Sequence, residues 1–261
     1  MHRNCDRKII RLKSVDSTHL YAVKIIETKV NSKDFDAHFG SCAITAENQT
    51  AGVGRYGRSW SSCSGNLFLS IIEPLFDENN LGQISLTVAC AVHESLSELV
   101  PNENHFSLHW PNDIYYKNRK ICGILISVIY RWMVISIGVN VKTTPDLDSA
   151  ISISEILNGK TPDLDSLLHN ILNHLDGWFF RLKNYGFDEA KNYWSEHACQ
   201  LHSFVTIKNG NDSLSGIFVE IDERGKAVLN VGDRFAYVSS GDLFVNMKNL
   251  MVEYGEKNEK D

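Results

Sequence analysis

The sequence predicts an α+β fold in which a domain of mixed helices and strands is followed by a small antiparallel β-barrel. Three observations support this prediction. The run 121–141 is rich in Ile and Val, and Arg131 divides it into two segments of strand length. Apolar residues recur at helical spacing in 81–100, with a second amphipathic helix expected over 162–182. From Phe204 onward, short alternating strands are separated by turn residues, as in small barrels.

The composition is that of a folded globular protein and not of a nucleic-acid-coating protein. Of 261 residues, 43% are hydrophobic and 22% charged, and the formal net charge is −6. Domains that coat nucleic acid usually carry a basic excess. The six cysteines include no Cys-x-x-Cys pair, which argues against a zinc knuckle or a thioredoxin-type redox site. Several lie in apolar runs, and the N-terminus lacks an apolar signal segment, so we expect a reducing, cytoplasmic location.

The first two-thirds of the chain is expected to contain both strands and helices. The first helix should begin after Asp16, Ser17 and Thr18, residue types that cap helix N-termini. The helix that begins at Leu81 should end at Pro101, because proline cannot continue a helix. Strands are expected at residues 8–12, 41–46, 66–72, 106–110, 121–129 and 133–141.

The long apolar run 121–141 is interpreted as two buried strands joined by a tight turn. A membrane span is the alternative, but Arg131 would then lie near the bilayer centre at a cost of about 3 kcal/mol. Further helices are expected over 162–182 and 187–197, and a domain boundary near Gln200. The expected organisation is a main domain over 1–199, a barrel over 200–250 and a charged tail over 251–261.

The most informative segment runs from Gln49 to Trp60 and reads Gln-Thr-Ala-Gly-Val-Gly-Arg-Tyr-Gly-Arg-Ser-Trp. Its glycines satisfy the pattern G-x-G-x-x-G, but no helix follows them, which disfavours a dinucleotide-binding turn. Arg55 and Arg58 offer planar donors to phosphate or carboxylate, and glycine allows the backbone to approach closely. Spacing alone does not distinguish a loop that closes over an anionic ligand from an exposed surface loop.

A second polar segment follows the short strand over 106–110. Because Pro111 cannot continue that strand, Asn112 and Asp113 are expected in a turn, where their side chains can meet a ligand or a metal. Lys120 comes just before the buried run, so its ammonium can point into a cleft. Taken alone, this segment fits an ordinary polar turn better than a functional site.

Taken together, these segments resemble the biotin–protein ligase family. The family pattern has a Ser-Thr pair at the first helix, a glycine–arginine loop, Trp-Pro-Asn-Asp with a lysine seven residues beyond the Asp, then Gly-Ile-Leu and Gly-x-Asn. The matching segments are Ser17–Thr18, Gln49–Trp60, Trp110–Asp113, Lys120, Gly123–Leu125 and Gly138–Asn140. Three residues depart from the pattern: His19 replaces Asn, Val53 replaces Arg and His109 replaces Lys.

The resemblance implies a fold and a reaction. The fold is a mixed β-sheet flanked by helices, of the class II aminoacyl-tRNA synthetase and biotin ligase type, with an SH3-like C-terminal barrel. The reaction joins biotin to ATP, in the presence of Mg²⁺, to give biotinyl-5′-AMP. A lysine of a biotin carboxyl carrier domain then displaces AMP. Only 16 residues precede Ser17, so we expect the monofunctional type without an N-terminal DNA-binding domain.

The resemblance also implies roles for individual residues. Lys120 is expected to contact both the biotin carboxylate and the α-phosphate, and Asp113 to bind Mg²⁺ or to accept a proton. The expected catalytic residues are Lys120, Arg55, Arg58 and Asp113. The expected biotin-binding residues are Ser17, Thr18, His19, Gln49, Gly52, Val53, Gly54, Arg55, Lys120 and Gly123. The expected residues around ATP and the adenylate are Arg55, Arg58, Trp60, Asn112, Lys120 and Asn140.

Other interpretations stay open at this point. A lipoate–protein ligase would share the architecture, although we expect it to lack the glycine–arginine loop. A non-catalytic protein that binds or senses biotin is a second alternative, because Val53 and His109 depart from the family pattern. His109 itself is interpreted as an ordinary surface or partly buried histidine. We expect no DNA or membrane partner, and a homodimer remains open.

Overall fold

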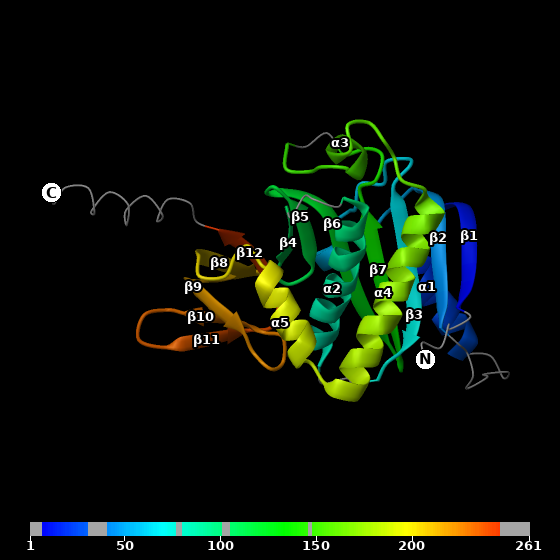
Figure 1. Cartoon of the computed structure of the whole chain (residues 1–261). Coiled ribbons are helices and arrows are strands. Elements are labelled where there is room, and N and C mark those ends of the chain that lie inside the picture. Colours follow the sequence, from blue (N-terminus) through cyan, green and yellow to red (C-terminus); the bar gives the residue numbers. More distant parts are fainter. Residues whose placement is uncertain (1–6, 31–40, 77–79, 101–104, 146–147, 246–261) are drawn as a thin grey trace.

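The structure is a computed structural model that describes residues 7–30, 41–76, 80–100, 105–145 and 148–245. Two β-sheets organise these residues (Figure 1). The expected charged tail, 251–261, lies outside the described residues. The predicted α+β class is therefore confirmed, with a larger mixed sheet followed by a smaller antiparallel one.

The larger sheet has seven strands in the order β1-β2-β3-β7-β6-β5-β4. The pair β1 and β2 is parallel, and the other described pairs of this sheet are antiparallel. Its strands are β1 (Lys8–Val15), β2 (Cys42–Gln49), β3 (Leu67–Pro74), β4 (Phe106–His109), β5 (Asp113–Tyr116), β6 (Arg119–Ile129) and β7 (Trp132–Val139). The expected pair of buried strands is thus confirmed as β6 and β7, and Tyr130 adopts a positive φ in the turn between them.

Helices cover both faces of this sheet. Ile71 and Ile72 are consecutive in β3 and belong to different apolar clusters, because successive strand residues point to opposite faces. One cluster joins the sheet to α2 and α4, which Figure 1 shows side by side, and the other joins it to α1. The helices are α1 (Thr18–Val30), α2 (Leu81–Leu99), α3 (Ile153–Ile156), α4 (Leu164–Tyr185) and α5 (Asp188–His197).

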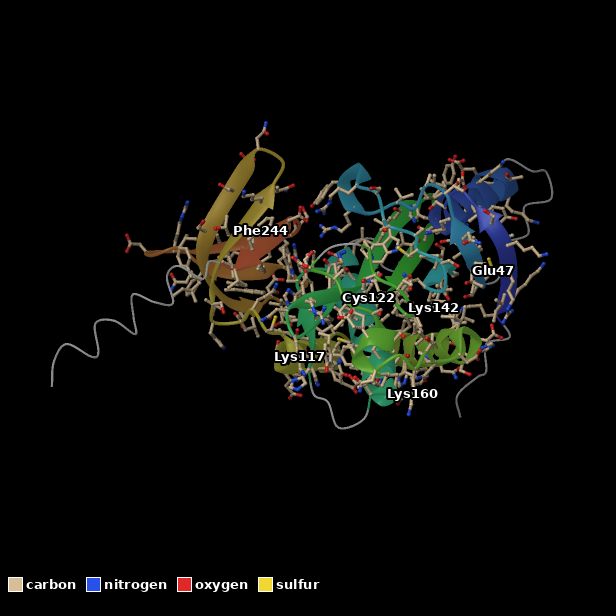
Figure 2. The ribbon with its side chains drawn as sticks, turned by 90° about the horizontal axis from the view of Figure 1, so that it is seen from above. Glu47, Lys117, Cys122, Lys142, Lys160 and Phe244 are labelled. Carbon is tan, nitrogen blue, oxygen red and sulfur yellow. The ribbon has the colours of Figure 1, made fainter. Side chains whose placement is uncertain are left out.

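The smaller sheet has five antiparallel strands in the order β11-β10-β9-β8-β12. They are β8 (Phe204–Asn209), β9 (Asp212–Ile221), β10 (Ala227–Asn230), β11 (Phe235–Val238) and β12 (Asp242–Val245). Its inner face packs on α5, where the rings of Trp194 and Phe218 lie 6.3 Å apart. In Figure 2, Cys122 marks β6 of the larger sheet and Phe244 marks β12 of the smaller one.

The structure differs from the expected elements in several places. Asp113 is the first residue of β5, a strand that the sequence did not predict, while Asn112 lies in the expected turn. This strand exists because β4 and β6 pair with it on both sides. The first strand continues to Val15 and not to residue 12, and the short helix α3 was missed. Among the described helices, none has both the length and the apolar character that crossing a bilayer requires.

Candidate active site

A cavity of about 310 Å³ lies where α1 begins, beside the starts of β3 and β6 and the second half of β7. That volume is at the lower end of the range of small-molecule sites. Every residue that the sequence assigned to the site lines the cavity except Gly52. The lining members of that set are Ser17, Thr18, His19, Gln49, Val53, Gly54, Arg55, Arg58, Trp60, Asn112, Asp113, Lys120, Gly123 and Asn140.

The start of α1 forms one wall of the cavity. The backbone N–H and the hydroxyl of Thr18 both donate to Oε1 of Gln49, at 2.8 and 3.0 Å. The amide of Gln49 in turn donates to Oγ of Ser62 at 3.1 Å. The Oγ of Ser17 is buried and has no partner in the structure. Gln49 therefore fixes the first helical turn, and Ser17, which lines the cavity, keeps a buried hydroxyl without a partner.

A chain of hydroxyl groups continues this wall across the sheet. Ser70 donates to Oγ1 of Thr18 at 2.9 Å and lies 2.8 Å from Oγ of Ser136. His19 contacts Ser136 through Nδ1 at 2.8 Å and Ser127 through Nε2 at 3.2 Å. Burial lowers the pKa of His19, which favours the neutral ring. Sequence reasoning did not identify Ser70 or Ser127, although a serine inside an apolar strand is a usable signal.

The segment from Gly52 to Trp60 is a small ordered hairpin, which we call the arginine hairpin. Trp60 N–H donates to the carbonyl of Gly52 at 2.8 Å, and Val53 pairs with Ser59. Its tip, Arg55–Gly57, is one 3₁₀ turn, and no α-helix follows it. Gly57 has a φ of 72°, in the left-handed region that glycine adopts without strain. The dinucleotide-binding interpretation is therefore excluded.

Trp60 lies against two glycines that pair with each other across β6 and β7. An added Cβ would fall 2.8 Å from the Trp60 ring at Gly123 and 2.5 Å from it at Gly138. Only glycine therefore leaves room for the indole in this position. The Nζ of Lys120 lies 5.7 Å from the centre of the ring, within reach of a cation–π contact. Gly52 lies outside the lining because it packs inside the hairpin, against Ser62 and the Trp60 carbonyl.

Three cationic side chains meet at the cavity. The Nζ of Lys120 lies 2.6 Å from Oδ2 of Asp113. Arg58 pairs with Asp242 of β12 at 2.8 Å. Arg55 donates to Oδ1 of Asn112 at 2.7 Å and, more weakly, to the carbonyl of Gly241 at 3.3 Å. The arginines thus contact Asp242 of β12 and Gly241 just before it, which sequence reasoning missed because no local pattern connects them to the hairpin.

Unpaired polar atoms concentrate in this cavity. In the described part of the chain, five buried side-chain nitrogen or oxygen atoms have no hydrogen-bond partner, and three belong to cavity residues. Those three atoms are Oγ of Ser17, Nε1 of Trp60 and Oδ1 of Asp113. Because buried polar atoms are nearly always paired in native proteins, these three indicate where a polar ligand binds. Asn140 contributes its side-chain amide, which donates to the carbonyl of Lys120 at 3.4 Å.

His109 does not line the cavity. Its ring stacks on Tyr115 with centroids 3.7 Å apart, Nε2 lies 2.7 Å from Sγ of Cys199, and Nδ1 accepts from the amide of Gln200 at 2.8 Å. Burial, with a smaller contribution from the charge of Lys120, lowers the pKa of His109 to about 4. The side chain packs between β5 and the segment that leads into the smaller sheet.

Comparison with known proteins gives consistent matches. Residues 15–142 match the family described as Biotin/lipoate A/B protein ligase family. The chain is 30% identical over 215 residues to the biotin–[acetyl-CoA-carboxylase] ligase of Mycobacterium tuberculosis, covering 79% of this chain and 80% of the relative. It is 27% identical to the ligase of that name from Paracoccus denitrificans, covering 73% of this chain and 84% of the relative. The structure is similar to that of the biotin protein ligase from Aquifex aeolicus in complex with biotin and ATP. The TM-score between the two structures is 0.78 and the sequence identity is 28%, with 92% of this chain and 98% of the Aquifex chain covered.

Proposed function

Since the chain belongs to the biotin/lipoate A/B protein ligase family, we propose that it is an ATP-dependent biotin–protein ligase. It joins biotin to ATP and then transfers biotin to a lysine of a biotin carboxyl carrier domain. The observation that carries this proposal is the convergence of Arg55, Arg58 and Lys120 on one cavity. Carboxylase carriers are the expected acceptors, because the bacterial relatives are named for acetyl-CoA carboxylase.

The first step joins two anions. An oxygen of the biotin carboxylate attacks the α-phosphorus of ATP, the bond from that phosphorus to the bridging oxygen breaks, and pyrophosphate leaves. Repulsion between carboxylate and phosphate opposes the approach, so cations must contact both groups. Lys120 is the proposed residue for this role, which is supported by the contacts of its ammonium with Asp113 and the Trp60 ring at the cavity. Arg55 and Arg58 contribute further guanidinium donors for the phosphates.

The second step transfers the acyl group. The amine of the carrier lysine attacks the carbonyl carbon of the mixed anhydride, the bond to the phosphate oxygen breaks, AMP leaves, and the amine loses a proton. Asp113 is the candidate to accept that proton when no cation occupies Oδ1, a role supported by the unpaired Oδ1 beside the Oδ2 that holds Lys120. Until the carrier arrives, the intermediate must be protected from water, and the arginine hairpin, whose residues line the cavity, is the proposed cover.

The biotin end is assigned to the wall at the start of α1. Ser17 offers its unpaired hydroxyl, and Thr18 and Gln49 offer polar groups that their mutual hydrogen bonds hold in place. A ureido ring carries both donors and a carbonyl acceptor, which this mixed set can satisfy. His19 supports the wall through its two serine contacts. The adenylate end is assigned to Trp60, Asn112 and Asn140, with the two arginines.

The residues present also fit Mg²⁺ bound together with ATP. The described residues include no cluster of three His, Cys, Asp or Glu side chains that could hold a metal by themselves. Mg²⁺ needs only one or two carboxylates when substrate phosphates supply the other ligands. Asp113 would hold it through the unpaired Oδ1, and the ion would neutralise phosphate charge.

The direct test is exchange of labelled pyrophosphate into ATP, measured with biotin and again with lipoate. We expect exchange with biotin only, followed by labelling of a carrier domain. The same exchange in Lys120→Ala should fall to near background, and the matched control is Lys117→Ala, an exposed lysine in the turn before β6. Exchange with lipoate and not with biotin would reject the proposal in favour of the lipoate branch of the family.

A further inference from the structure

The arginine hairpin touches the smaller sheet at the point where β12 begins, which we call the Gly241–Asp242 corner. We infer that this corner is a latch that holds the arginine hairpin closed, so that the smaller sheet helps retain the reaction intermediate. Asp242 is then a positioning residue that acts through Arg58. The inference rests on the proposed ligase function and adds a role for the smaller sheet.

Two contacts form the latch. Arg58 Nη2 lies 2.8 Å from Oδ1 of Asp242, and Arg55 Nη1 donates to the carbonyl of Gly241 at 3.3 Å. Both join residues more than 180 positions apart, so they connect the tip of the hairpin to a separate sheet. The Arg58 side chain is 57% exposed to solvent and the Asp242 side chain is 33% exposed. An ion pair this exposed stabilises the closed hairpin only modestly, which suits a contact that must open for ligand exchange.

The corner itself is firmly placed. Asp242 pairs with Lys208 of β8, and the neighbouring Leu243 pairs with Ile207, a core residue of the smaller sheet. Gly241 has a φ of 146°, and an added Cβ would fall 2.5 Å from the Ile207 side chain and 2.8 Å from the carbonyl of Lys208. The backbone at Gly241 therefore lies directly on β8, and its carbonyl and the next carboxylate are presented at a fixed position.

The latch leaves Arg58 able to bind phosphate. Its guanidinium has five N–H groups. One bonds the carbonyl of Arg55 at 3.2 Å, and one bonds Asp242. The remaining donors can contact a phosphate oxygen while the pair with Asp242 persists. Asp242 also lines the cavity, so the residue that closes the latch would lie beside the bound intermediate.

The test uses the full chain with Asp242→Asn, which removes the charge and keeps the shape. The rescue variant is Asp242→Glu, and the matched control is Asp233→Asn, an exposed carboxylate in the turn between β10 and β11. Two quantities are measured: hydrogen exchange of residues 52–60 without ligands, and the rate at which labelled biotinyl-adenylate leaves the protein.

In Asp242→Asn both the hairpin exchange and the release rate should rise about two- to fivefold, the range expected for an exposed ion pair. Asp242→Glu should restore both toward wild type, and Asp233→Asn should change neither. High salt should raise the wild-type release rate toward that of Asp242→Asn, because salt screens the pair. Unchanged hairpin exchange, or faster exchange without faster release, overturns the latch. A wild-type protein that forms no adenylate overturns the proposed function instead. The two failures are distinguishable, because the hydrogen exchange of residues 52–60 is measured without ligands and tests the hairpin contact in either case.

Discussion

The contact between Trp60 and the paired glycines of β6 and β7 makes Gly138→Ala a sharp test of the site. The added methyl carbon would lie 2.5, 2.7 and 2.8 Å from three atoms of the Trp60 ring. Carbon atoms in contact are normally about 3.5–4.0 Å apart, so the indole must move by about 1 Å. Gly138 has no positive φ, so alanine adds no backbone strain and the effect is purely steric.

Two magnitudes follow from this displacement. Overpacking costs about 1–3 kcal/mol, and displacing a substrate-positioning group by about 1 Å can cost about 100-fold in rate. We therefore expect a moderate fall in the melting temperature and a fall of about 100-fold in kcat/KM for biotin-dependent pyrophosphate exchange. Gly177→Ala in α4 is the control, because the nearest atom to its added Cβ is 3.8 Å away. That variant should be stabilised by up to about 1 kcal/mol and keep its activity.

A double-mutant cycle separates the Trp60 clash from other effects of the alanine. If the ring is the obstacle, Trp60→Phe should soften the loss of stability caused by Gly138→Ala, because the smaller ring leaves space for the methyl group. Additive losses of stability in the two variants would contradict this account. Wild-type melting and exchange in Gly138→Ala alone would refute the packing of Trp60 against the two glycines.

Three further predictions concern charge. Lys120→Ala should keep the melting temperature and lose at least about 100-fold in biotin-dependent exchange, and an equal loss in Lys117→Ala would contradict it. Arg55→Gly should release the adenylate early, seen as biotin on bystander lysines, whereas labelling confined to the carrier would refute the hairpin's role as a lid. Burial lowers the pKa of His93 to about 4, so the unfolded chain takes up a proton first and stability falls as pH drops from about 6.5 to 4. His93 contributes up to about 3 kcal/mol to this fall, and His109, whose pKa is also lowered to about 4, contributes separately. The fall should therefore be smaller in His93→Gln than in the exposed control His169→Gln, and equal falls in the two variants would contradict the assignment.

Much of the candidate site was predictable because its residues form compact motifs. The Ser-Thr pair, the glycine–arginine segment and the Trp-Pro-Asn-Asp segment each lie within about a dozen residues, and the family comparison confirms the resemblance they suggested. The hydroxyl chain through Ser70 and Ser127 was not predictable. Those serines come from separate strands, and their contacts with Thr18 and His19 arise only when the sheet closes around α1.

The strand β5 illustrates the same limit for the fold. Asp113–Tyr116 was expected to begin with a turn, because Pro111 and Asn112 are turn residues. The structure makes it a strand, since β4 and β6 offer hydrogen-bonding partners on both sides. Local preference therefore decided where the chain turns, and pairing decided that a strand begins directly after the turn.

The α+β class, the buried strand pair β6 and β7, and the motifs on which the proposed ligase function rests could all be predicted from the amino-acid sequence. These depend on hydrophobic period, turn residues and short spacings, all of which are local. Three contacts could not be predicted and come from the packing of the folded chain: Trp60 fills the space above Gly123 and Gly138, Asp113 holds Lys120, and Asp242 reaches Arg58. The physical reason is that each of these contacts joins side chains from different elements, and their separation is set by how the sheets and helices pack.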